Sequence, residues 1–253
     1  MKVQCIWEHN GDDTLLYAGN FPGAYTRGRS KEEALAKMPQ EIMSYLRWKC
    51  GATDMGAIAE ETEMEYGDAS AGGQMTVEIV QDKPCDLQVC DADSDVLFDS
   101  EREPLTMEEY QTLKALVLKS AEDFHHLYES IPNKHKSALA SRKTFYGTVP
   151  VTAQEMYDHT KNVNEYYFGE IDIPADNEGT IYECRKRGFE ALERSEGYLD
   201  NTVIEGSYDE LWSLRKVLRR FLWHDRIHAR AMYRMARKTF GVDAVENIFC
   251  FKF

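Results

Sequence analysis

Two histidines near the end of the chain have the spacing of a metal-binding pair. His224 and His228 stand four residues apart, so on a helix their imidazole rings would project from one face, one turn apart. Rings placed in this way can bind the same divalent ion. Val217, Phe221 and Met235 continue that face, which is the apolar face that a helical bundle would bury. Two buried imidazoles indicate either a metal site or core histidines satisfied by hydrogen bonds.

A third histidine favours the metal site. His159 belongs to a different helical segment, on an apolar side that includes Met156 and Tyr166. Packed helices can bring residues far apart in the sequence to one point, so we predict a metal site formed by His159, His224 and His228. Three neutral imidazoles leave a divalent ion open to a further ligand, as in reactive sites. Imidazole suits nickel, zinc, iron and copper alike, so the residues do not select among these metals.

Other polar residues near these histidines have simpler interpretations. Asp225 follows His224 directly. Its carboxylate could orient an imidazole, but pairing with a neighbouring arginine on the helix is the favoured interpretation. Tyr157, Tyr166 and Tyr167 could line a pocket. Because aromatic residues at helical spacing are usually core residues, we leave these three outside the predicted site.

The second half of the chain carries the helices that must position these residues. From Thr106 an apolar stripe with helical spacing continues until Pro132. Thr152 can cap a second helix, which contains His159. A third helix is expected over residues 179–199. With a fourth helix that contains the histidine pair, these segments predict a four-helix bundle.

The fourth helix is expected over residues 207–241. Ser207 stands three residues before Glu210, which is the spacing of a capping box, and Gly241 is a typical stop. Lysines and arginines are frequent along this segment and circle much of the helix. This distribution favours ion pairing with the acidic remainder of the chain over one continuous face for nucleic acid.

Residues 1–90 have the pattern of strands with one helix. KVQCIWEHN and TLLYAGN flank a GDD turn and predict a hairpin, and FPGAYTRGRS contains a further short strand. Ser30 and Glu33 have capping-box spacing and predict a helix that ends between residues 48 and 51. Residues 51–74 read as an exposed connection, and MTVEIVQD then alternates like a strand. The expected order is β-β-β-α-β.

Residues 91–105 form the expected linker between the two halves. Asp91, Asp93 and Asp95 have the alternating spacing of a calcium loop, but no glycine stands at the sixth position, so a solvated turn is favoured. The chain contains six cysteines, none of them in a CxxC pair, and we interpret all six as reduced thiols. These are Cys5, Cys50, Cys85, Cys90, Cys184 and Cys250.

The overall charge restricts the classes of partner. The formal net charge of −14 opposes broad electrostatic binding to nucleic acid or to anionic lipid, because both would repel the average surface. The first residues reach charged side chains before any apolar run, and no later stretch has the length of a membrane span. We therefore expect a folded cytoplasmic protein with no membrane partner.

The helical half resembles a known family. TAQEMYDH (152–159) and FLWHDRIHARAM (221–232) are similar to the second and last helices of the DinB-like superfamily, and the resemblance covers residues 106–253. It implies a four-helix bundle that holds one divalent ion, nickel, zinc or iron, through His159, His224 and His228. It also implies a thiol-dependent enzyme, such as a transferase that joins a low-molecular-weight thiol to a small electrophile.

The N-terminal half resembles a different family. The stretch GNFPGAYTRGRSKEEALAKMPQEIMSYL (19–46) is similar to the HicB-like antitoxin domain, with its Pro-Gly turn, its EEAL helix and the Tyr-Leu at the end of that helix. The resemblance implies a partial ribonuclease H fold without the acidic active site. In that family the domain binds a partner ribonuclease toxin, and we carry over only the fold.

Together these patterns predict an α+β protein in three parts. Residues 1–90 are the HicB-like domain, 91–105 the linker and 106–253 the DinB-like bundle with the metal site. The leading hypothesis for function is a metal-dependent thiol S-transferase whose ligands are a small thiol and an electrophile. Two other hypotheses stay open, a partner-binding module with a structural or vestigial metal, and a metal sensor. The sequence also leaves open whether the bundle forms a homodimer.

Overall fold

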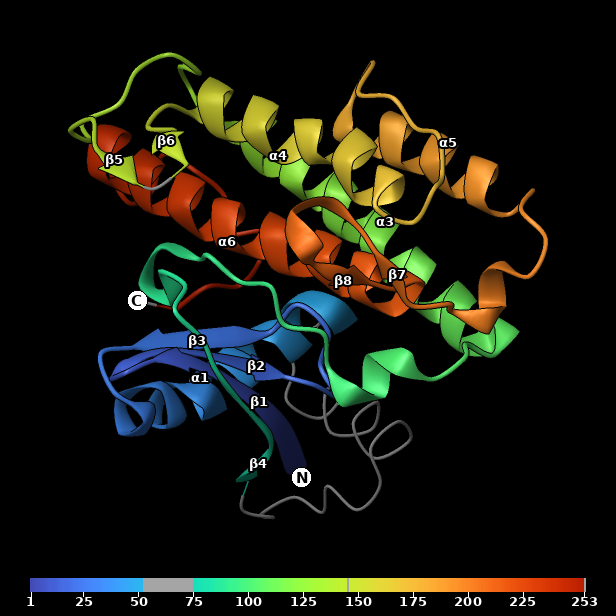
Figure 1. Ribbon diagram of the computed structural model, residues 1–253. Coiled ribbons are helices and arrows are strands. Elements are labelled where there is room, and N and C mark those ends of the chain that lie inside the picture. The colour runs from blue at the N-terminus through green and yellow to red at the C-terminus, as the bar shows by residue number, and fades with distance from the viewer. Residues whose placement is uncertain (52–74, 145, 253) are drawn as a thin grey trace. The chain divides into compact units, whose positions relative to one another are not determined.

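A computed structural model describes residues 1–51, 75–144 and 146–252, and these residues form two compact units (Figure 1). The sheet unit comprises Met1–Val96 and Phe249–Phe253, and the helical unit comprises Leu97–Ile248. A small N-terminal sheet and five α-helices in the described residues make the fold mixed α+β, as predicted. The expected connection over 51–74 lies, apart from Gly51, outside the described residues.

The sheet has four strands in the order β3-β2-β1-β4. The strands are β1 (Lys2–Asn10), β2 (Asp13–Ala18), β3 (Tyr25–Gly28) and β4 (Thr76–Pro84). β1 and β2 form the predicted antiparallel hairpin, and β4 runs parallel to β1 along its other side. A parallel neighbour requires a crossover, and the helix that lies between β3 and β4 in the chain belongs to that crossover.

Helix α1 (Lys31–Cys50) begins and ends where the sequence predicts. The Ser30 hydroxyl accepts a hydrogen bond from the amide of Glu33 and so caps the first turn. Gly51 ends the helix with φ of 62°, a left-handed conformation that glycine adopts without steric cost. One face of the helix is an apolar stripe that is buried, namely Ala34, Met38, Ile42, Tyr45 and Leu46.

The last described residues complete the core of the sheet unit. Phe249 stacks on Trp48 with ring centroids 5.3 Å apart, and Phe251 stacks on Phe249 at 5.6 Å. The Ser44 hydroxyl donates to the carbonyl of Cys250 at 2.8 Å. The sequence predicts one bundle over residues 106–253, whereas this short segment groups with the sheet unit.

Four helices of the helical unit pack into a bundle (Figure 1). They are α3 (Met107–Ser130), α4 (Ala153–Gly169), α5 (Ile181–Leu192) and α6 (Leu214–Phe240). α3 and α4 each contact both α5 and α6. Each helix therefore buries its apolar face against two others, as in a four-helix bundle. No helix in the described parts of the chain has the length and apolar character needed to span a membrane.

Threonine caps determine where the first three of these helices begin. In each case the hydroxyl binds the amide of a glutamate three residues later, and that glutamate binds back to the threonine amide. The pairs are Thr106–Glu109, Thr152–Glu155 and Thr180–Glu183. α5 is shorter than the expected helix over 179–199. It packs closely on α4, because a Cβ added at Gly188 would lie 2.2 Å from the Phe168 ring.

The last helix begins later in the chain than predicted. Ser207 does not cap it; instead Ser213 accepts a hydrogen bond from the amide of Lys216 and is the N-cap of α6. The predicted stop is confirmed, since the amide of Gly241 binds the carbonyl of Arg237. The predicted helix was therefore right in its second part and wrong at its start.

A small hairpin occupies the place of the missing helical turns. Its strands are β7 (Ile204–Glu205) and β8 (Leu211–Trp212). Between them Tyr208 and Asp209 have φ of 62° and 59°, which no right-handed helix contains. Glu210, the expected partner of Ser207 in a capping box, instead forms an ion pair with the buried Lys216 at 2.8 Å.

Short elements complete the described structure. A second hairpin is formed by β5 (Lys143–Thr144) and β6 (Gly147–Thr148), and single 3-10 turns lie at Val89–Asp91, Asp99–Arg102 and Tyr198–Asp200. A further short turn, Ser207–Asp209, is interrupted by the left-handed conformation of Tyr208. All six cysteines are free thiols.

Candidate metal centre

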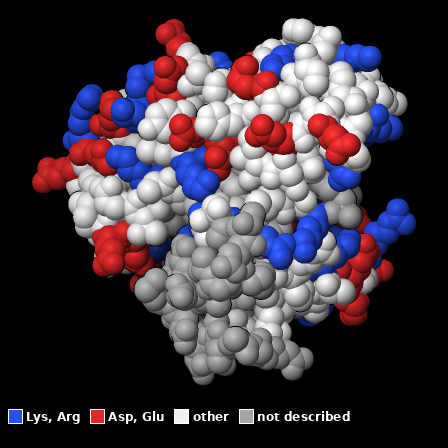
Figure 2. Space-filling view, turned by 180° about the vertical axis from the view of Figure 1, so that it is seen from behind, with Lys and Arg blue, Asp and Glu red and all other residues white. Residues whose placement is uncertain are grey.

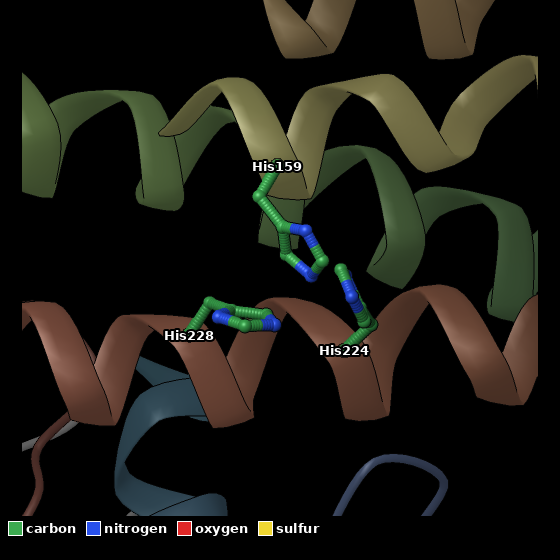
Figure 3. A group of neighbouring side chains, drawn as sticks. All are labelled: His159, His224 and His228. Atoms are coloured by element: carbon green, nitrogen blue, oxygen red, sulfur yellow. The ribbon is translucent and has the colours of Figure 1, made fainter. Parts of the chain in front are cut away.

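The three predicted histidines converge between two helices. His159 projects from α4 toward His224 and His228 on α6 (Figure 3). One nitrogen from each ring can be chosen so that all three lie within 4.8 Å of one another. The ring centroids are 5.1 Å apart for His159–His224, 4.6 Å for His159–His228 and 4.4 Å for His224–His228. In the described parts of the chain this is the one such cluster of potential ligands.

The helices hold these side chains in place through their buried faces. The Thr152 cap sets the start of α4 and hence the rotation of His159 two turns later. On α6 the predicted face is confirmed, because Val217, Phe221 and Met235 are fully buried. The histidine pair lies within this face, so the packing of α6 against α4 brings the three rings together.

Burial favours the neutral form of His159 and His224, which is the form that a metal requires. His224 is buried, whereas His159 and His228 are half-buried. Burial lowers the pKa of His159. The pKa of His224 lies well below its usual value because of burial first, and then because of the positive charge that His228 and His159 would carry. Metal ligation needs deprotonated imidazole, so the environment favours the ligating form.

Within the histidine cluster, one buried imidazole nitrogen has no hydrogen-bond partner. Nδ1 of His224 is buried, and no donor or acceptor in the described structure bonds it. A core histidine held only for structure would have such a partner, so this atom does not fit that interpretation. A cluster of neutral imidazole nitrogens with a buried nitrogen to satisfy fits a divalent ion.

The lowered pKa of His224 predicts a loss of stability in acid for metal-free protein. An unfolded histidine takes up its proton near pH 6.5, but folded His224 does so only at lower pH. As the pH falls below about 6.5 the unfolded state binds more protons, so the free energy of unfolding falls by up to about 1.4 kcal/mol per pH unit for this group. The free energy of unfolding, measured with urea in the presence of a chelator at several pH values, should fall less steeply with falling pH in His224→Gln than in the unaltered protein. An equal dependence on pH in the two proteins would contradict a lowered pKa of His224.

Asp225 pairs with an arginine, as favoured, but the arginine lies on another helix. Both Asp225 and Arg185 of α5 are fully buried. The guanidinium donates to the two carboxylate oxygens at 2.6 Å and 3.2 Å, and it lies 4.2 Å from the ring centroid of Phe221. Burial raises the pKa of Asp225, and the charge of Arg185 opposes the rise. The ion pair ties α5 to the residue beside His224.

Tyr167, which the sequence does not assign to the site, adjoins it. The buried ring of Tyr167 meets the His224 ring edge-on, with centroids 6.0 Å apart. Tyr157 instead bonds His125 Nδ1 at 3.0 Å and the amide of Ile181 at 3.1 Å, which is a core role. In the sequence the only signal for Tyr167 is its position about two turns after His159 on the same helix.

Basic residues of α6 form ion pairs, as their distribution predicts. Arg219 binds the buried Glu101, with Nη2 donating to Oε2 at 3.0 Å, and Arg215 binds Glu109 at 3.1 Å. On the face shown in Figure 2, basic and acidic side chains are intermixed over much of the surface. The predicted turn near Asp93 also has local bonds, since its carboxylate accepts from the Gln88 amide at 3.2 Å.

The chain matches no protein-family model, no curated protein and no solved structure. The resemblances to the DinB-like and HicB-like families therefore remain predictions from the residues themselves. What the structure adds independently is the convergence of the three histidines.

Proposed function

We propose that the chain binds one divalent ion, nickel, zinc or iron, through His159, His224 and His228 and acts as a DinB-like, metal-dependent thiol S-transferase on small electrophiles. The observation that carries the proposal is the approach of three imidazoles from two helices, with potential ligand atoms within 4.8 Å of one another. The buried, unpartnered Nδ1 of His224 supports a ligand at this point. The sequence motifs around the three residues support the choice of reaction.

Such a reaction first needs a site that holds a divalent ion and leaves it able to bind a thiolate, and the three histidines would provide this site. Three neutral imidazoles supply no negative charge, so a bound divalent ion would still attract an anionic ligand. An ion held there would lower the pKa of a thiol bound to it and keep the sulfur deprotonated at neutral pH. In the transfer, sulfur forms a bond to the electrophilic carbon, the leaving group departs with its electron pair, and the thiol proton passes to solvent.

The half-buried position of two ligands fits a site that small molecules can reach. His159 and His228 retain part of their solvent exposure, whereas His224 is only 8% exposed. A purely structural site would be closed on all sides by protein ligands. The three-histidine arrangement instead supports an exchangeable position, which thiol transfer needs.

Elemental analysis followed by a conjugation assay tests the proposal. Protein purified without an affinity tag is expected to contain one equivalent of metal and to join small thiols to an aryl halide such as chlorodinitrobenzene. His224→Ala is expected to lose both properties. The matched control is His126→Ala, because His126 is an exposed histidine of α3. Metal-free protein with full conjugation activity would overturn the proposal.

A further inference from the structure

A cavity lies within the helical unit, at the end of the bundle where α6 begins (Figure 1). Its volume is about 140 Å³. The wall is formed by the residues that follow α4, the end of α5 with the turn after it, strand β7 and the first residue of α6. An apolar cavity of about 150 Å³ accommodates a molecule of the size of benzene. This cavity therefore has room for about one six-membered ring.

The cavity is separate from the candidate metal centre. Leu214, with which α6 lines the cavity, stands ten residues before His224. Ten residues of helix correspond to about 15 Å along the axis. On the side of α4 the lining begins at Ile171, twelve residues after His159. A molecule in the cavity would thus occupy a different site from a thiol bound to a metal ion.

Aliphatic side chains form the apolar part of the wall. Ile171, Ile173, Leu192 and Leu214 are each at most 8% exposed. Ile204 of β7 is half-buried and also lines the cavity. A ring placed against these side chains would leave water together with the apolar surface that it covers. Removal of apolar surface from water is the main source of binding energy in pockets of this kind.

Hydrogen bonds hold the wall in its shape. Asn201 lines the cavity, and its Nδ2 donates to two backbone carbonyls of the segment before α3 at 2.8 Å and 2.7 Å. Its Oδ1 accepts from the amide of Arg215 at 2.9 Å. The amides of Ile171 and Ile173 both bind the carbonyl of Phe168, at 3.1 Å and 3.0 Å. A site formed in advance in this way loses little conformational entropy when a ligand enters.

The remaining polar groups of the wall determine which charge a ligand can carry. Among the described residues that line the cavity, Glu196 alone is charged, and its side chain is exposed. The hydroxyls of Ser195 and Thr202 line the cavity beside it. A carboxylate attracts an ammonium group and repels an anion. The formal net charge of −14 adds to this preference for a cation.

We propose that this cavity binds a small primary amine with an apolar ring or chain of about six carbons. The ring would lie against the isoleucine and leucine side chains. The ammonium group would face Glu196 and the hydroxyls of Ser195 and Thr202, because its three N–H donors match these acceptors. The inference goes beyond the proposed function and does not depend on a metal ion.

Benzylamine, benzyl alcohol and benzoate test the inference, because they share one ring and differ in charge. Binding to the full-length protein is followed by NMR of the isoleucine methyl groups, in a chelator that keeps the amine from binding a metal ion. The methyl groups of Ile171, Ile173 and Ile204 should shift, whereas that of Ile131, outside the lining, should not. Benzylamine is expected to bind about fivefold more tightly than benzyl alcohol, as an exposed ion pair allows. Benzoate should bind more weakly than the alcohol.

A substitution at the carboxylate tests the role of its charge. In Glu196→Gln the preference for the amine over the alcohol should fall to about one, with the affinity for the alcohol unchanged. The matched control Glu190→Gln removes an exposed carboxylate of α5 that does not line the cavity, and it should keep the preference.

Two outcomes would overturn the inference. If none of the three isoleucine methyl groups shifts with any of the compounds, the cavity is not a binding site. Equal affinities for the amine and the alcohol in the unaltered protein, or a preference that survives Glu196→Gln, would reject an amine as the ligand. The comparison of the three compounds in the unaltered protein requires no variant, so misfolding of a variant cannot obscure it.

Discussion

Replacing Asp225 by alanine is expected to lower the free energy of unfolding by about 3–5 kcal/mol. The carboxylate is fully buried and accepts two hydrogen bonds from Arg185, which is itself fully buried. Without its partner the guanidinium would remain charged in an apolar interior, and that unpaired charge is the source of the loss. Chemical denaturation monitored by tryptophan fluorescence and circular dichroism measures the change.

Two controls show whether the effect comes from the buried charge. The double variant Arg185→Met with Asp225→Leu removes both charges, and we expect it to be much closer in stability to the unaltered protein. Asp176→Ala breaks the pair with Arg187 on the surface, where the side chains are 43% and 48% exposed, and should cost at most about 1 kcal/mol. If Asp225→Ala were no more destabilising than Asp176→Ala, the buried pair would not have the role described.

Divalent metal is expected to stabilise the protein by about 4 kcal/mol when the free ion is present at roughly a thousand times its dissociation constant. The unfolded chain has no preformed site, so binding energy adds to folding energy. For a unit of this size the gain corresponds to a rise in Tm of about 8–16 °C. Thermal unfolding with nickel, zinc or iron, compared with unfolding in a chelator, measures this rise.

The rise should depend on the three histidines and on no other histidine. His224→Ala is expected to lose nearly all of it, because two imidazoles remain and the deepest ligand is gone. His126→Ala, on the exposed face of α3, should retain it. A metal-dependent rise of the same size in His224→Ala would place the ion elsewhere in the protein.

The helix starts that could be predicted are those that depend on local chemistry. Ser30, Thr106 and Thr152 each bind the amide three residues later, and both partners are visible in a short stretch of sequence. The start of α6 shows where this reasoning fails. Ser207 and Ser213 both have the residue type of a cap. Which serine caps the helix depends on the pairing of β7 with β8 and on the ion pair of Glu210 with Lys216. The residue types of a capping motif contain neither of these interactions.

For the candidate metal site, too, the local pattern could be predicted from the sequence and the contacts between distant segments could not. The pair His224 and His228 follows from helical periodicity, and His159 from its place on an apolar stripe. The residues that surround the histidines could not be predicted, because the residues they contact are distant in the sequence. Arg185 reaches Asp225 across 40 residues. The contact of Tyr167 with His224 depends on how two helices pack, and periodicity within one helix carries no such information.

The return of the C-terminal segment has a consequence for how the protein forms during synthesis. Phe249 and Phe251 complete the apolar cluster around Trp48, so the sheet unit is built from two pieces of chain with the whole helical unit inserted between them. On the ribosome the bundle emerges before the sheet unit has its last aromatic residues. The part of the protein that is translated first is thus the part that can finish folding last.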